Sequence, residues 1–208
     1  ALELQNLTVV CGCGGGLAVD RVLAEVITHA ARLVLDADAL NVIATQTPLQ
    51  TLVIERSQRG LPTVLTPHPL EAARLLGLAT TDIQAHRIRA AQQLAERFQC
   101  VAILKGSGTV IAEPGHLPTV NSTGNARLAT AGTGDVLAGM VGARWAAGAS
   151  ALHAATGAVY AHGLAADQWL IHDVHQRNAG IDARRFMDTA DSIEPTLTAS
   201  ALARRVSA

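Results

Sequence analysis

The chain has 208 residues, 49% of them hydrophobic, and a mean hydropathy of +0.26, which allows a substantial buried core and fits one α/β domain. A net charge of −1 with only 2% aromatic residues disfavours nucleic-acid binding, which relies on basic surfaces and stacking side chains. The sequence contains neither the run of about eighteen apolar residues that a membrane helix needs nor the pattern of a signal peptide. We therefore expect a soluble, cytoplasmic protein that binds no membrane.

Alternating strand and helix patterns predict a mostly parallel sheet with helices on both faces, followed by a small antiparallel hairpin with a Pro-Gly turn. The predicted strands are 7–11, 32–35, 63–65, 101–104, 110–112 and 117–120. The predicted helices are 20–31, 48–55, one after His68 that ends at Gly77, 81–98, one of small residues in the later part of 121–142, 149–170 and 197–206, with a capping box at Thr81-x-x-Gln84 and irregular structure over 171–195. Because no repeat or linker marks a boundary, we treat 1–208 as a single domain.

The first strand ends in a glycine turn, Gly12-Cys13-Gly14-Gly15-Gly16. The turn does not match the dinucleotide fingerprint G-x-G-x-x-G, since Leu17 takes the place of the third glycine. Close approach to a ligand and a plain tight turn both remain open here. The odd number of cysteines argues against a disulfide framework or a zinc site, so we interpret Cys11-x-Cys13 as a strand end of small residues.

Polar side chains follow the next two strands. Asp36, Asp38 and Asn41 come directly after one strand, and His68 and Glu71 follow the next. In an open α/β sheet, ligands collect beyond the carboxyl ends of the strands, where these groups should lie. Helix capping would explain the first three equally well. Prolines on both sides restrict the backbone at His68, as suits a side chain held toward a site.

Lys105 is the only lysine among sixteen basic residues, and it ends the fourth strand in Lys105-Gly106-Ser107-Gly108-Thr109. A compact, flexible ammonium in an arginine-rich chain suggests a contact with phosphate, although chance would also leave one lysine. The segment is not a Walker A motif, because the G-x-x-x-x-G spacing before the lysine is absent.

The stretch 121–142 runs from a glycine-rich turn into a helix of small residues. The N–H groups of Gly132-Thr133-Gly134 and the positive end of the helix dipole should form an anion site. Asp135 lies in that site, so we interpret its carboxylate as a proton acceptor or a metal partner. His153, Tyr160 and His162 on the following helix are interpreted as packing or surface residues.

Four segments together resemble the ADP/ATP-dependent NAD(P)H-hydrate dehydratases, a family of nicotinamide-nucleotide repair enzymes in the ribokinase-like superfamily. The segments are VLDADALN (34–41), LTPHPLEAARLLG (65–77), LKGSGTVIA (104–112) and NSTGNARLATAGTGDVLAGM (121–140). The resemblance implies a three-layer ribokinase-like fold. It also implies that the chain lacks an N-terminal section, which in the family includes part of the substrate-side wall.

The resemblance implies an ADP-dependent (S)-NAD(P)H-hydrate dehydratase, a lyase. Such an enzyme phosphorylates the ring hydroxyl of hydrated NADH or NADPH (NADHX or NADPHX) at the expense of ADP or ATP, and loss of phosphate regenerates the cofactor. It implies a Mg²⁺ requirement and assembly as a homo-oligomer, a tetramer. The implied roles are catalysis for Asp135, Gly132 and Gly134; nucleotide binding for Lys105, Gly106, Ser107, Gly108, Thr109 and Gly134; hydrated-cofactor binding for Gly14, His68 and Asp135; and metal binding through water for Glu71.

The chain departs from the family pattern at three places. The usual GPGLG turn reads Gly12-Cys13-Gly14-Gly15-Gly16, Leu70 takes the glycine slot of HPGE, and Ala131 replaces a glycine. Two alternatives remain at this stage. One is a kinase of the same superfamily that acts on a sugar or vitamin precursor, and the other is a non-catalytic nucleotide-binding remnant.

Overall fold

The computed structural model describes residues 3–178 and 199–206, whose six-stranded sheet has the order β1-β2-β3-β4-β5-β6. The strands are β1 (Thr8–Cys11), β2 (Arg32–Leu35), β3 (Thr63–Leu65), β4 (Val101–Leu104), β5 (Val110–Ala112) and β6 (Thr119–Val120). The first four pair in parallel, and β5 and β6 pair antiparallel to their neighbours. The predicted parallel sheet with an added hairpin is confirmed.

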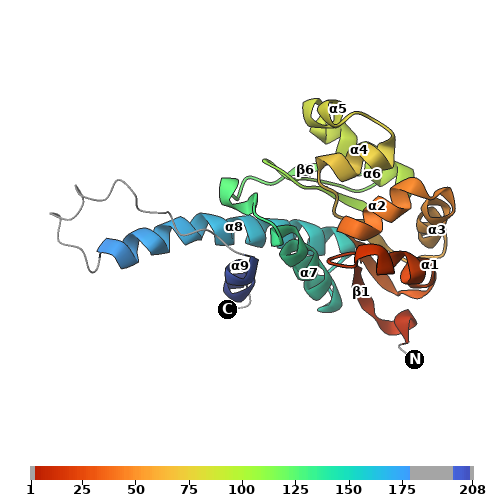
Figure 1. The fold of residues 1–208 in the computed structure, drawn as a ribbon, viewed down its shortest axis with the longest axis horizontal. Coiled ribbons are helices and arrows are strands. Elements are labelled where there is room, and N and C mark those ends of the chain that lie inside the picture. The colour runs from red at the N-terminus through yellow and green to blue at the C-terminus, as the bar shows by residue number, and fades with distance from the viewer. Residues whose placement is uncertain (1–2, 179–198, 207–208) are drawn as a thin grey trace.

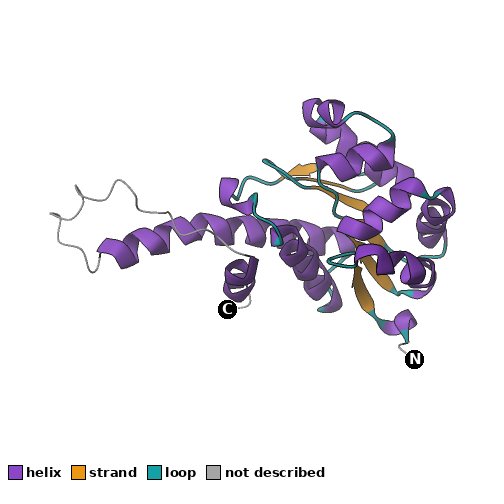
Figure 2. Cartoon of the chain, viewed as in Figure 1, coloured by secondary structure: helices purple, strands orange, loops and turns teal. Residues whose placement is uncertain are grey.

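Helices cover both faces of this sheet (Figures 1 and 2). They are α1 (Val19–His29), α2 (Ala37–Thr45), α3 (Thr47–Gln58), α4 (Pro69–Leu76), α5 (Thr80–Ala85), α6 (Arg87–Phe98), α7 (Thr133–Ala146), α8 (Ala151–Asn178) and α9 (Ala199–Val206), with short 3₁₀ turns at Leu4–Asn6, Gly16–Ala18 and Ala126–Leu128. Parallel strands in sequential order need crossovers that step in one direction, and right-handed crossovers place all their helices on one face. This explains why α1 to α6 share a face, while α7 and α8 cover the other.

The core divides into two layers because side chains alternate along each strand. Ala102 and Leu104 of β4 pack with the helices of the first face, whereas Val101 and Ile103 pack against α7 and α8. The small residues of α7 allow its close approach to the sheet: a Cβ at Gly142 would lie 2.5 Å from a methyl of Val10. The helix α7 thus packs closely on the sheet at Gly142, whereas Gly139 faces open space.

Two local predictions were wrong. Thr81 does not cap a helix, since α5 begins after Ala79 without a side-chain cap and a turn at His86 separates it from α6. The irregular segment predicted from Ile171 is helical as far as Asn178, because α8 continues beyond its alanine-rich part (Figure 1). The remainder of that segment, 179–195, lies outside the described residues. The last predicted helix corresponds to α9.

Candidate active site

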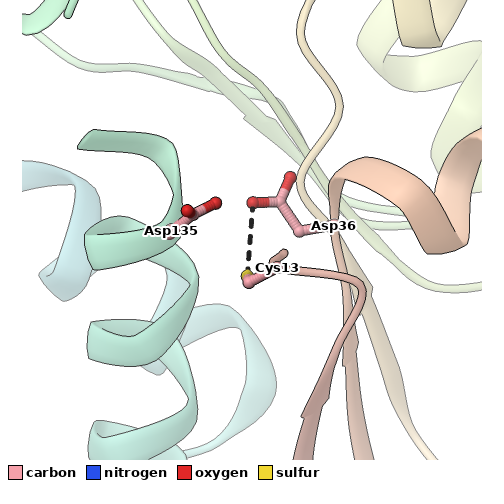
Figure 3. A group of neighbouring side chains, drawn as sticks. All are labelled: Cys13, Asp36 and Asp135. Atoms are coloured by element: carbon pink, nitrogen blue, oxygen red, sulfur yellow. Dashed lines mark hydrogen bonds between the residues drawn. The ribbon is translucent and has the colours of Figure 1, made fainter. Parts of the chain in front are cut away.

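Strands β1 to β4 all end at the same edge of the sheet, because they run parallel. Cys13, Asp36, His68 and Lys105 follow these strands in that order, and the last three were predicted to lie at this edge. The first turn of α7, with Asp135, comes to the same edge from the other layer (Figure 3). Ligands of open α/β sheets bind at this edge.

Asp36 and Lys105 form an ion pair across this edge, with 2.6 Å between Nζ and Oδ1. The Asp36 side chain is 1% exposed and that of Lys105 is 19% exposed, so the pair is largely shielded from water. Asp36 precedes α2 but its side chain does not cap that helix, which leaves the carboxylate to the lysine. The next residue, Ala37, has a φ of +45°, a left-handed conformation costly for a residue with a Cβ. Such strain is typical of functional sites.

Cys13, Asp36 and Asp135 converge beside this ion pair (Figure 3). One ligand atom from each lies within 4.8 Å of the others, and the Cys13 thiol donates to Oδ2 of Asp36 at 3.9 Å. Burial, together with the charges of Asp36 and Asp135, raises the pKa of the Cys13 thiol to about 12, although Lys105 opposes the shift. The thiol therefore stays protonated near neutral pH. Cys13 is part of the site, beyond the strand-end role given to it by the sequence.

The first turn of α7 is open to this site. Gly132 precedes the helix with a φ of +84°, and no side chain caps it. A Cβ at Gly134 would lie 3.2 Å from the Lys105 ammonium, so the first turn and the lysine are in close contact. The Thr133 hydroxyl donates to carbonyls of the preceding turn, and Nε2 of His162 donates to the Thr133 carbonyl at 2.9 Å.

A cavity of about 620 Å³ opens at the same edge. It is lined by two groups of predicted site residues, Lys105, Gly106, Ser107, Gly108 and Thr109 together with His68 and Gly134. The buried His162 and the loop 121–130 complete its wall. Gly14, Glu71, Gly132 and Asp135 do not line it. The structure thus joins the predicted nucleotide segment to His68, and places Asp135 outside that cavity beside Cys13 and Asp36.

His68 and Glu71 are held by one another. Nδ1 of His68 accepts from the N–H groups of Leu70 and Glu71, while the buried Glu71 carboxylate accepts from the N–H of His68 at 2.7 Å. The second carboxylate oxygen of Glu71 lies 3.2 Å from Nε2 of His68. This reciprocal arrangement is a capping box for α4. It fixes His68 at the cavity and occupies the Glu71 carboxylate, whose metal role stays a prediction.

The glycine turn after β1 is also shaped by close contacts. Gly12 has a φ of +116°, and a Cβ there would lie 1.9 Å from the carbonyl oxygen of Asp36, so only glycine fits. Asp38 accepts from the N–H of Gly16 at 2.8 Å, and Asn41 pairs with Arg74. Gly14 is exposed, with a φ of +63°. Asp38 and Asn41 therefore make structural contacts, whereas Asp36 belongs to the site.

Comparison of the solved structures identifies the fold as ribokinase-like. The ADP/ATP-dependent NAD(P)H-hydrate dehydratase of Bacillus subtilis aligns with a TM-score of 0.69 at 29% identity, over 95% of this chain and 63% of that one. A ribokinase-like superfamily protein from Enterococcus faecalis aligns with a TM-score of 0.63 at 24% identity, over 95% and 62% of the two chains. The expected fold class is confirmed.

A family model described as NAD(P)H-hydrate dehydratase matches residues 3–187, and the chain belongs to this family. The ADP-dependent (S)-NAD(P)H-hydrate dehydratase of Neisseria meningitidis is 42% identical over 183 residues, which are 87% of this chain and 58% of that protein. The chain therefore spans less than two thirds of the length of these relatives. Within the described residues, none of the helices has the length and apolar character needed to cross a membrane.

Proposed function

We propose that this chain is an ADP-dependent (S)-NAD(P)H-hydrate dehydratase, in which nucleotide and hydrated cofactor meet at the start of α7. The observation that carries the proposal is the position of Asp135 and the Asp36–Lys105 pair at that helix start, beside the cavity lined by Lys105–Thr109. Family membership supports the substrate class. Phosphoryl transfer requires positioned reactants, neutralised charge and a base, and this edge of the sheet supplies groups for each.

In the proposed mechanism, the Lys105–Thr109 segment binds ADP in the cavity. Asp135 accepts the proton of the ring hydroxyl while the hydroxyl oxygen forms a bond to the terminal phosphorus of ADP. The bond between that phosphorus and the oxygen of the departing AMP breaks. The N–H groups of Gly132 and Gly134 stabilise the phosphoryl oxygens, and that of Thr133, which donates to the Thr130 carbonyl at 3.3 Å, would join them only by leaving this bond. The C–O bond then breaks and phosphate leaves with the ring oxygen, while the adjacent ring carbon loses a proton to water and the double bond of NADH or NADPH forms. Gly14 and His68 contact the hydrated cofactor.

We further propose that the reaction requires Mg²⁺, which when bound neutralises phosphate charge. The donor set at the site fits this ion only in part: Asp36 and Asp135 offer the oxygen atoms that Mg²⁺ prefers, whereas the Cys13 thiol is a soft ligand. Because Mg²⁺ keeps several waters and binds through few carboxylates, the exposed Asp135 is its most accessible protein partner. Glu71, whose carboxylate accepts from the His68 N–H in the capping box, is the proposed water-mediated partner.

The test is to incubate the chain with NADPH hydrate, Mg²⁺ and ADP and to follow the nicotinamide absorbance. We expect the absorbance to return with one AMP formed per cofactor repaired. A phosphorylated product that accumulates would instead identify a small-alcohol kinase of the same superfamily. ADP binding in calorimetry with no turnover would identify a non-catalytic nucleotide-binding protein. Light scattering tests the predicted homo-tetramer.

A further inference from the structure

Arg87, the first residue of α6, lies against the Lys105–Thr109 segment and is not among the residues that line the cavity. Its Nη2 donates to the carbonyl oxygens of Leu104, Lys105 and Gly108 at 3.2, 3.4 and 3.3 Å. Its Nη1 donates to Oε1 of Gln84 at 3.2 Å. One guanidinium thus holds three carbonyl groups from both ends of the segment.

The location of Arg87 is electrostatically unfavourable for the helix that carries it. A cation in the first turn opposes the positive end of the helix dipole, and no acidic residue lies in the first turn of α6. Within the described ranges, 3–178 and 199–206, Arg87 forms no ion pair with a carboxylate. Residues that break a local rule in this way are typical of functional positions.

The carbonyl contacts determine where the opposite ends of these peptide groups point. In a planar trans peptide, the C=O of one residue and the N–H of the next point in opposite directions. The Lys105 N–H belongs to the same peptide group as the Leu104 carbonyl. It donates to the Pro67 carbonyl at 2.9 Å, away from Arg87. The N–H groups of Gly106 and Thr109 are turned away from Arg87 in the same manner, and both residues line the cavity.

Gly106 shows how closely the segment lies on the guanidinium. Its φ is +141°, and a Cβ there would lie 2.8 Å from Nη1 and 3.0 Å from Nη2 of Arg87. A side chain at position 106 would displace either the guanidinium or the loop. The glycine and the arginine therefore form one unit that sets the conformation of the segment.

We propose that Arg87 is a positioning residue for nucleotide binding: it orients the Lys105–Thr109 backbone so that the N–H groups of Gly106 and Thr109 face the cavity, and it adds positive charge behind them. The inference rests on the proposed function, which assigns the nucleotide to this cavity. Donors that already point toward the ligand raise its affinity, because binding does not then have to offset the entropy cost of ordering the loop.

The experiment compares Arg87→Met, Arg87→Lys and Gly106→Ala in the full 208-residue chain, with Arg89→Met as the matched control, since Arg89 is an exposed arginine on the same helix. Calorimetry measures the Kd of ADP and of NADPH hydrate, and thermal unfolding gives Tm. For Arg87→Met we expect the Kd of ADP to rise about tenfold, while the Kd of the hydrate stays within about twofold. Arg87→Lys keeps the positive charge but loses the forked guanidinium, so its Kd for ADP should lie between those of wild type and Arg87→Met.

Gly106→Ala disturbs the same unit from the loop side and should raise the Kd of ADP while Arg87 is retained. The control should change neither Kd. Unchanged ADP binding in folded Arg87→Met or in Gly106→Ala would overturn the inference, as would equal losses of both ligands with a lowered Tm. Wild-type protein that binds neither ADP nor the hydrate would overturn the proposed function, and the inference with it. If wild type binds ADP but not the hydrate, the result counts against the proposed substrate only. The Kd of ADP in the variants then still tests the role of Arg87.

Discussion

The helices α4 and α7 both begin at the carboxyl edge of the sheet, but their first turns are built differently. At α4, His68 and Glu71 satisfy one another and the first N–H groups of the helix. At α7, Gly132 offers no side chain, and the Asp135 carboxylate lies beside Cys13 and Asp36. The donors of α4 are thus occupied by the chain itself. At α7 the N–H of Thr133 donates to the Thr130 carbonyl, but within the described residues those of Gly134 and Asp135 make no such bond and are available for a ligand.

Lack of a cap is not in itself the distinguishing feature, because α1, α3, α5 and α6 also begin without a side-chain cap. What sets α7 apart is its surroundings: Lys105 lies against Gly134, and the cavity includes Gly134. A helix start becomes a candidate anion site when a positively charged side chain and an open cavity meet there. The predictions below test this contrast between α4 and α7.

The largest effect is expected at α7 from Asp135→Asn, which keeps the shape of the side chain but removes the base. Turnover should fall by about 10²–10⁴-fold, since this is the usual contribution of a positioned base. The Kd of ADP should change little, because Asp135 does not line the cavity. A coupled absorbance assay measures turnover, and calorimetry measures binding.

The matched control is Asp82→Asn, which alters an exposed acid in the first turn of α5, remote from the site. It should leave turnover unchanged. If Asp135→Asn also keeps wild-type turnover, the base is another group and α7 has no catalytic advantage over α4.

The next largest effect is expected from Lys105→Met. The change leaves the buried Asp36 carboxylate without its main partner, which should lower the free energy of unfolding by about 3 kcal/mol. It also removes a charged donor from the cavity wall, so ADP affinity should fall by about 10- to 100-fold. Denaturant unfolding and calorimetry measure the two effects.

Adding Asp36→Asn to Lys105→Met separates structure from binding. The double variant no longer has an unpaired buried charge and should recover most of the stability, while ADP affinity should stay low. If stability and affinity recovered together, Lys105 would act on the nucleotide only through the integrity of the fold.

The sheet and most helices could be predicted from sequence because their signals are local: apolar strands, glycine turns and helical periodicity. The same signals placed Asp36, His68 and Lys105 at one edge. The partnership of Asp36 with Lys105 could not be predicted, since the two residues are 69 positions apart and only the sheet order makes them neighbours. Lys105 stood out because it is the only lysine in the sequence, but it was interpreted as a phosphate contact, which does not indicate a pair with Asp36.

Other parts of the site lacked any local signal. Cys13 looked like a strand end, His162 looked like a packing or surface residue, and Arg87 fell inside the predicted helix 81–98. The capping box was assigned to Thr81 because it fits the usual pattern, whereas the real box at α4 uses a histidine in place of serine or threonine. Such roles depend on tertiary contacts, here with α7, with Lys105–Thr109 and with β4, which periodicity does not encode.

A smaller effect is expected at α4 from Glu71→Gln. The amide is a weaker acceptor for the His68 N–H, so the free energy of unfolding should fall by about 0.5–2 kcal/mol, as for loss of a cap. If the Glu71 carboxylate serves only α4, the Mg²⁺ concentration for half-maximal turnover should not change. Denaturant unfolding and a Mg²⁺ titration measure the two. A clearly raised Mg²⁺ requirement would place Glu71 in the metal site and weaken the contrast with α7.

The smallest effect concerns His162, which anchors the start of α7 through the Thr133 carbonyl. Burial lowers the pKa of His162 below its ordinary value of 6.5, and the Lys105 charge adds to this although the hydrogen bond to Thr133 opposes it. Between the folded-state pKa and 6.5 the unfolded chain binds more protons, so stability falls as pH falls through that window. Tm measured from pH 7 downward should therefore decline more steeply in wild type than in His162→Gln. The same change at His153, an exposed histidine on α8, should not alter the slope. If the slopes of wild type and His162→Gln coincide, a charged His162 is tolerated there, and the start of α7 does not depend on a neutral imidazole.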